Sequence, residues 1–92
     1  MSDTPAEPAG MQVTVRYFAA ARAAAGVESE TVVVPAGTTV TGLVDMLAVR
    51  GTRLATVLSR CSCLRSGIAV RDPATALSPG DTVDVLPPFA GG

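Results

Sequence analysis

Residues 39–50 form the clearest amphipathic pattern in this chain, and they constrain the fold more than any other segment. Thr39 is suited to cap a helix N-terminus, and Gly51 is typical of the residue that follows a helix. A helix of this kind must bury its apolar side, and the segments around it have the character of short strands. The pattern therefore predicts an α+β roll in which the helix covers one face of a sheet. The apolar positions, spaced i, i+3, i+4, i+7 and i+8, are Val40, Leu43, Val44, Leu47 and Ala48.

Four segments are expected to supply the strands. A strand points successive side chains to opposite faces, so apolar residues at every second position indicate a buried face. Residues 11–17 show this alternation, and further strands are expected at residues 27–34, at 64–70 with an interruption at Ser66-Gly67, and at 82–86. The residues of 11–17 expected to face the core are Met11, Val13, Val15 and Tyr17.

Short helices and turns are expected to connect the strands. Alanine favours helix, so residues 18–25 predict a short helix that stops at Gly26, and residues 52–63 predict a second. Pro35-Ala36-Gly37 suits a type I turn with proline at its second position, and Ser78-Pro79-Gly80-Asp81 suits a type II turn.

The chain of 92 residues has room for one domain. Residues 1–10 are rich in proline, alanine and glycine, and we expect them to be a flexible leader outside the fold. Residues 11–86 are then the domain. Residues 87–92 are expected to form an extended C-terminal tail, because Pro87 and Pro88 cannot donate to a strand ladder.

The composition argues against a self-contained active site. The chain has no histidine, lysine or tryptophan. It therefore lacks a histidine base, a histidine metal ligand, and a lysine for phosphate or Schiff-base chemistry. Cys61 and Cys63 are too few to close a metal site, and we interpret them as partly buried packing residues. We expect no metal, no bound cofactor and no enzymatic activity of the chain alone.

Charge and hydropathy limit the partners and the compartment. The formal net charge is −1, and one tyrosine and two phenylalanines offer no stacking surface for bases, so nucleic acid is not an expected partner. No signal sequence or long apolar run indicates secretion or a membrane span. The expected location is the cytoplasm.

The C-terminal segment Pro87-Pro88-Phe89-Ala90-Gly91-Gly92 favours a chemical role. Glycines at a chain end lose much entropy on ordering and bury nothing, which argues against a structural role. Six extended residues reach at most ~20 Å, and glycines without Cβ atoms could enter a channel too narrow for side chains. A terminal carboxylate with a pKa of about 3.3–3.7 is an unreactive anion at neutral pH until a partner activates it.

The residues from 11 to 92 resemble the MoaD/ThiS sulfur-carrier family, and among its branches the small subunits of molybdopterin synthases. A Gly-Gly end alone is weak evidence, but Gly-Asp before a final strand that leads into Pro-Pro-x-x-Gly-Gly is specific. The motifs that carry the resemblance are Tyr17-Phe18-Ala19-Ala20-Ala21-Arg22 with Gly26, Gly37-Thr38-Thr39-Val40, Leu77-Ser78-Pro79-Gly80-Asp81-Thr82-Val83, and Leu86-Pro87-Pro88-Phe89-Ala90-Gly91-Gly92.

This resemblance implies a β-grasp, ubiquitin-like roll with a mixed sheet of four to five strands packed on one main helix. It implies that an ATP-dependent activating enzyme adenylates the Gly92 carboxylate, which is then sulfurated to a thiocarboxylate. The sulfur would go to cyclic pyranopterin monophosphate on a large subunit, within a heterotetramer of two large and two small subunits. Phe18 matches a position that docks the large subunit, and Arg22 matches one near the activating enzyme; core packing and a solvated charge are the respective alternatives. Partners would also hold the tail residues Pro87, Pro88, Phe89, Ala90 and Gly91.

Two other functions remain open from the residues. The chain could carry sulfur for thiazole or cysteine synthesis, or it could be a non-covalent ubiquitin-like interaction module with an inert tail.

Overall fold

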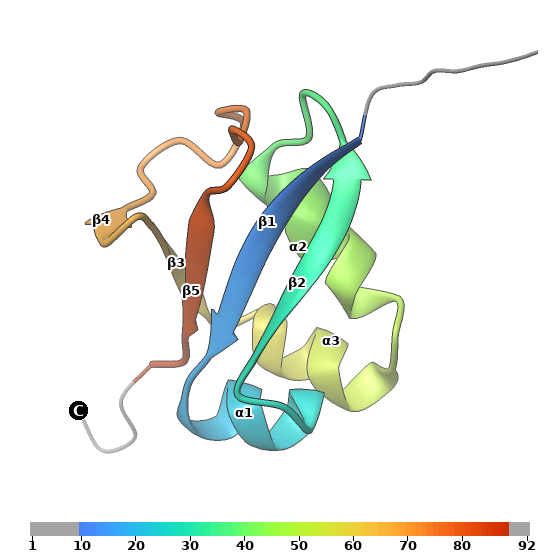
Figure 1. The fold of residues 1–92 in the computed structure, drawn as a ribbon. Coiled ribbons are helices and arrows are strands. Elements are labelled where there is room, and N and C mark those ends of the chain that lie inside the picture. The colour runs from blue at the N-terminus through green and yellow to red at the C-terminus, as the bar shows by residue number, and fades with distance from the viewer. Residues whose placement is uncertain (1–9, 89–92) are drawn as a thin grey trace, which may run out of the picture.

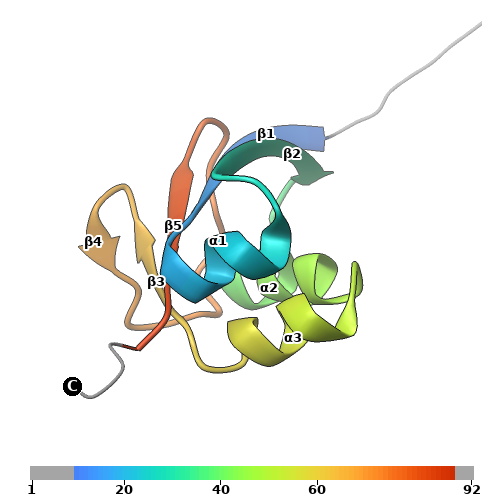
Figure 2. The same cartoon turned by 90° about the horizontal axis from the view of Figure 1, so that it is seen from below.

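A computed structural model describes residues 10–88, which form one mixed β-sheet and three helices (Figure 1). The helices lie together on one face of the sheet, and the other face is left open (Figure 2). The elements in chain order are β1 (Gly10–Tyr17), α1 (Ala19–Ala25), β2 (Ser29–Pro35), α2 (Val40–Ala48), α3 (Thr52–Leu58), β3 (Ser62–Arg65), β4 (Ile68–Ala69) and β5 (Thr82–Leu86).

The strands lie in the order β2-β1-β5-β3-β4. β1 and β5 pair in parallel at the centre of the sheet, and the other three pairings are antiparallel. The first and last strands are therefore neighbours, and everything between them packs around this central pair. This arrangement confirms the predicted α+β roll with a mixed sheet and one principal helix, α2, supported by two shorter ones.

The core lies between the sheet and the helices. The alternation predicted for β1 is confirmed, because Met11, Val13, Val15 and Tyr17 are all buried. From α2 the core receives Val40, Leu43 and Leu47, while Val44 and Ala48 pack at its margin. The rest of the buried apolar set is Ala21, Val34, Leu54, Leu58, Leu77, Val83 and Val85.

Helix α2 begins as predicted and ends earlier. The backbone N–H of Gly42 donates to Thr39 Oγ1 at 3.0 Å, so Thr39 is the N-cap. The helix ends at Ala48 rather than at Arg50, because the N–H of Arg50 bonds to the carbonyl of Leu47 in a tighter, three-residue turn. The shorter helix α1 ends at Gly26 as expected, in the left-handed conformation with φ of 80°.

Three local predictions are wrong in detail. Residues 64–70 are not one interrupted strand but the hairpin of β3 and β4, because Ser66 and Gly67 both have positive φ and reverse the chain. Helix α3 ends at Leu58, so Cys63 belongs to β3. The turn at Pro35 closes one residue later than predicted, with the N–H of Thr38 on the Pro35 carbonyl and Gly37 at φ of 86°. The turn predicted at Ser78–Asp81 is confirmed.

A polar cluster ties β1, β2 and the end of α2 together. The Tyr17 hydroxyl donates to Glu30 Oε2 at 2.7 Å, and the Arg50 guanidinium pairs with the same oxygen. Burial, followed by the hydrogen bond to Glu30, raises the pKa of Tyr17 far above its usual range, so the hydroxyl remains a donor. Burial alone would raise the pKa of Glu30, but the bonds from Tyr17 and Arg50 outweigh it and hold that pKa below its usual value.

Glu30→Gln is expected to lower the free energy of unfolding by about 1–2 kcal/mol at neutral pH, because a charged acceptor of two hydrogen bonds is lost. A carboxyl whose pKa is lowered by folding stabilises the protein above its unfolded pKa and loses that contribution as the pH falls. The difference between wild type and variant should therefore shrink below about pH 4. Urea unfolding across pH measures it. Glu28→Gln, at an exposed carboxylate, is the control and should show little difference; a pH-independent Glu30→Gln effect would contradict the assignment.

Candidate functional site

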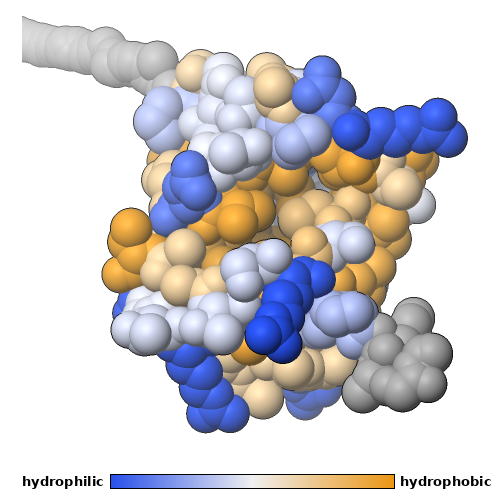
Figure 3. Space-filling view, turned by 180° about the vertical axis from the view of Figure 1, so that it is seen from behind, coloured by the Kyte–Doolittle hydropathy of each residue, from blue (hydrophilic) through white to orange (hydrophobic). Residues whose placement is uncertain are grey.

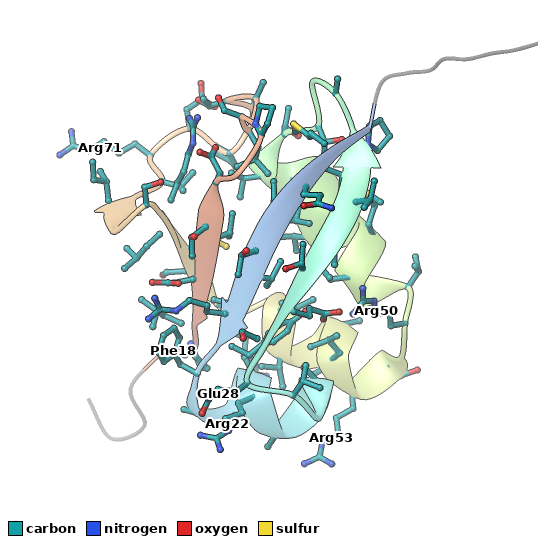
Figure 4. The ribbon with its side chains drawn as sticks, in the orientation of Figure 1. Phe18, Arg22, Glu28, Arg50, Arg53 and Arg71 are labelled. Atoms are coloured by element: carbon teal, nitrogen blue, oxygen red, sulfur yellow. The ribbon has the colours of Figure 1, made fainter. Side chains whose placement is uncertain are left out.

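The point where the chain leaves the sheet after β5 is the first element of the candidate site. β5 lies between β1 and β3 and ends at Leu86. Pro87 is half-buried and Pro88 is exposed, so the chain emerges from the sheet over these two residues. The exit lies at the end of the sheet where β1 turns into α1 (Figure 4). The predicted tail residues Phe89, Ala90, Gly91 and Gly92 lie outside the described residues.

Phe18 stands next to this exit. Tyr17 is opposite Val85 in the parallel ladder, so the next step of the register sets Phe18 beside Leu86. The Phe18 N–H donates to the Val85 carbonyl at 3.3 Å, and the Phe18 ring is half-buried. Ala19 then adopts a left-handed φ of 49°, a strained conformation for alanine that turns the chain into α1. The structure thus brings Phe18 to the base of the predicted tail.

Five side chains lie on the open face, on β1, β3 and β5 or next to them, where the chain leads to the exit, and we call them the exit platform. They follow from the register, because Arg16 lies opposite Asp84 and Asp84 lies opposite Leu64 in the two ladders that flank β5. The Arg16 guanidinium stands over the Phe18 ring, 5.3 Å from its centroid. The platform therefore combines apolar surface with a charge pair. Its members are Arg16, Phe18, Leu64, Asp84 and Leu86.

The carboxylate of Asp84 is the most distinctive group on the exit platform. Asp84 Oδ1 lies 3.2 Å from Arg16 Nε, and the Asp84 side chain is only 14% exposed. This contact is an ion pair without hydrogen-bond geometry, so the buried Oδ1 has no hydrogen-bond donor within residues 10–88. The Arg16 guanidinium balances the charge of this buried carboxylate without donating a hydrogen bond to Oδ1.

Arg22 lies on α1, and Figure 4 shows it near Glu28, at the same end of the sheet as Phe18. Its guanidinium is 3.3 Å from Glu28 Oε2, and both side chains are largely exposed. Arg22 and Phe18 line one shallow cavity of about 310 Å³ with Arg16, Ala19 and Glu28. Phe18 and Arg22, the two residues singled out in the sequence, are therefore neighbours that line the same cavity, and Phe18 is the one beside the exit.

A second hollow lies on the helical side, where apolar surface surrounds it (Figure 3). Its volume is about 390 Å³, and it is lined by α2, α3 and β3, including Cys61 and Cys63. Burial raises the pKa of both thiols, and the Cys61 Sγ donates to the Val57 carbonyl at 3.1 Å. Neutral, partly buried thiols are poor nucleophiles, which confirms these cysteines as packing residues.

The described part of the chain offers neither a metal site nor a membrane span. Residues 10–88 contain no cluster of three or more potential metal-ligating side chains. No helix in the same residues is long and apolar enough to cross a bilayer.

Sequence reasoning identified Phe18 through a motif but assigned no site role to Arg16, Leu64 and Asp84, nor to Leu86, which it placed in the C-terminal motif. The alternation within residues 82–86 contained part of the signal, because Val83 and Val85 face the core and the residues between and after them must face outward. The pairing of Arg16 with Asp84 needs the parallel register of β1 and β5, which no local pattern contains.

Comparison with known proteins agrees with this geometry. The chain is similar to three solved structures, and the match covers nearly the whole length of each of them. The HVO 2177 protein of Haloferax volcanii is 30% identical with a TM-score of 0.84, over 98% of this chain and 94% of that chain. A putative molybdopterin converting factor subunit 1 of Pyrococcus furiosus is 28% identical with a TM-score of 0.78, over 86% and 99%. SAMP1 of Haloferax volcanii is 26% identical with a TM-score of 0.76, over 88% and 99%.

Two more distant structures show the fold alone. One is the complex of subunits 1 and 2 of the molybdopterin-converting factor of Helicobacter pylori, with 24% identity and a TM-score of 0.61 over 89% of this chain and 100% of that chain. The other is a ubiquitin-like protein of Trypanosoma brucei, with 9% identity and a TM-score of 0.66 over 90% and 100%. They confirm the β-grasp, ubiquitin-like architecture.

None of the curated proteins is similar enough in sequence to count as a relative. The model of the ThiS family, in contrast, matches residues 15–92, which is most of the domain and the whole of the predicted tail. With the β-grasp fold and the exit platform at the base of that tail, this match shows that the chain belongs to the ThiS family.

Proposed function

We propose that this protein is a sulfur carrier and the small subunit of a molybdopterin synthase, with the Gly92 carboxylate as its reacting group. The observation that carries the proposal is the ThiS-family match, which extends through residue 92 and so includes the Gly-Gly end. The structural likeness to a molybdopterin converting factor subunit 1 favours the molybdopterin branch.

The chemistry requires two partner-catalysed steps. A carboxylate oxygen of Gly92 attacks the α-phosphorus of ATP, and pyrophosphate leaves, which gives an acyl-adenylate. The terminal sulfur of a persulfide on the donor then attacks the acyl carbon, and AMP leaves, which gives an acyl disulfide. A second thiol of the donor attacks the donor's own sulfur in that disulfide, so the donor ends as a disulfide and the thiocarboxylate leaves. ATP and the donor belong to the activating enzyme. The described residues of this chain supply the docking surface and hold the base of the tail.

The second partner is a large subunit that holds cyclic pyranopterin monophosphate, in an assembly of two large and two small subunits. The distant Helicobacter pylori structure, a complex of subunits 1 and 2, supports a partner of this kind. Two consecutive prolines at the exit restrict the backbone at the base of the tail, which favours a projecting arm over a collapsed end. The thiocarboxylate sulfur would form a bond to a carbon of the bound precursor as an oxygen leaving group departs. Water would then hydrolyse the acyl–sulfur bond, which leaves the sulfur on the precursor and returns Gly92 to the carboxylate.

A role as a protein modifier is the second candidate, because the chain is also similar to SAMP1, whose name stands for small archaeal modifier protein 1. In that role the adenylated Gly92 would be joined to an amine of another protein as an amide. Sulfur carriage for thiazole or cysteine synthesis uses the same thiocarboxylate and differs in the protein that receives the sulfur.

Incubation with an activating enzyme, ATP and a sulfur donor is expected to raise the intact mass by about 16 Da, the difference between sulfur and oxygen. The gain should depend on ATP. The loaded protein should then return to its original mass when a large subunit and its pterin precursor are added. Amide-linked conjugates without a 16-Da species would favour the modifier, and an unchanged mass with every component present would contradict both.

A further inference from the structure

We propose that the outer edge of β2 pairs with β2 of a second copy of this chain, so that two sheets join across a two-fold axis. β2 is the edge strand of the sheet, with seven residues and a neighbour on one side only within residues 10–88. Figure 1 shows it along the margin of the sheet, in front of α2. The inference rests on this edge and not on the proposed function.

The register identifies which backbone groups on the edge are free. The Tyr17 N–H donates to the Glu28 carbonyl at 2.9 Å, which sets the phase of the β1–β2 ladder. Bonded and non-bonded pairs alternate along an antiparallel ladder, so the amides of Glu30, Val32 and Val34 face β1. Those of Ser29, Thr31 and Val33 point outward, as do their carbonyls. The edge therefore presents alternating donors and acceptors that match those of an identical strand running antiparallel.

Apolar side chains accompany these groups. Val33 is 64% exposed on the strand itself, and Met46 and Val49 are 42% and 84% exposed on and just after α2. A groove of about 280 Å³ lies between β2 and α2, with Met46, Leu47 and Arg50 among its lining residues. Most of the large apolar side chains exposed in residues 10–88 lie on β2, just before it, or along α2; Ile68 on β4 is the exception.

The charges favour a second copy over a foreign partner. In natural proteins, lysine or inward-pointing charged residues on an edge strand commonly prevent it from pairing with another chain. This chain has no lysine. Glu30 is the only charged residue of β2, and its carboxylate is bound by Arg50 and Tyr17. Glu28, just before the strand, is paired with Arg22. In an isologous contact residue i of one copy meets residue j of the other, and the reverse, so an edge whose charges are already paired meets no repulsion from its copy and gives a charged partner nothing to recognise.

Pairing through β2 leaves the exit platform free. β1 separates β2 from β5, so the second copy lies at the sheet margin and each Pro87 exit remains open. A short strand pair with small flanking patches buries little area, which predicts a weak, concentration-dependent dimer.

Sedimentation equilibrium and amide hydrogen exchange test the proposal on the full chain. We expect a dimer with a dissociation constant below about 1 mM. The amides of Thr31 and Val33 should be protected from exchange only at high protein concentration, whereas the Val32 amide, which faces β1, should be protected at every concentration. Val33→Lys should raise the dissociation constant at least tenfold, because each copy then places a lysine on the pairing edge. Thr31→Pro should do the same by removing an outward donor without breaking the β1 ladder.

Ile68→Lys is the matched control, because Ile68 is 73% exposed on the opposite edge strand, β4. Its dissociation constant should equal that of the wild type. Protection of the Val32 amide reports that each variant is folded. A chain that stays monomeric to about 1 mM overturns the proposal. Amide exchange rates at Thr31 and Val33 that do not change with protein concentration would also overturn it. A loss of dimer in Ile68→Lys as large as in Val33→Lys would do the same.

Discussion

Deleting Gly91 and Gly92 is expected to abolish the sulfur-dependent mass gain while leaving the domain folded. Two residues contribute about 7 Å of reach, so the new carboxylate of Ala90 would stop short of the adenylating centre. A displacement of about 1 Å can cost about 100-fold in rate, so the loss should exceed about 100-fold. Intact mass after a fixed incubation measures it.

Gly92→Ala tests the width of the partner's channel separately from the length of the tail. This variant keeps the length and the carboxylate but adds a Cβ next to the reacting carbon, so it should slow loading if the partner's channel admits only glycine. Ala90→Gly keeps length and terminus and is the control, with loading expected close to wild type. Urea unfolding should not distinguish any of these variants from wild type. Full loading of the deletion variant would contradict Gly92 as the reacting residue, and its unfolding would make the tail structural.

Local chemistry predicted those parts of the fold that depend on neighbouring residues. The alternation of residues 11–17 placed all four core residues of β1, and Thr39 was identified as a cap from its hydroxyl and the apolar pattern after it. Leu77 was not expected in the core, because it lies in a loop with no periodicity. Its burial depends on a hydrogen bond from its N–H to the Thr38 carbonyl at 2.8 Å, across 39 residues of chain.

The pairing of β1 with β5 accounts for most of what sequence reasoning missed. Whether two strands 60 or more residues apart lie side by side depends on the packing of everything between them, so local propensity does not report it. Arg16 and Asp84 are ordinary surface charges in the sequence, and only the parallel register brings them together. Phe18 was identified from a motif, but its position beside the exit also follows from that register.

Phe18→Ser is expected to weaken binding to the large subunit by about 2–3 kcal/mol, or about 30- to 150-fold in dissociation constant. Phe18 is the aromatic residue of the exit platform, half-buried next to Leu86 and under the Arg16 guanidinium. Aromatic side chains at the centre of an interface contribute most to affinity, and this ring lies at the base of the tail. Arg22→Ala should cost about 1 kcal/mol at most, because Arg22 is exposed and paired with exposed Glu28.

Val49→Ser is the matched control for the loss of an apolar side chain, since Val49 is 84% exposed after α2 and far along the chain from the exit. Isothermal titration of each variant with the large subunit measures the dissociation constants, and urea unfolding confirms that Phe18→Ser is folded at the working temperature. If Phe18→Ser binds like Val49→Ser, the partner does not dock on the exit platform. If Arg22→Ala has the larger effect, docking is centred on α1 instead.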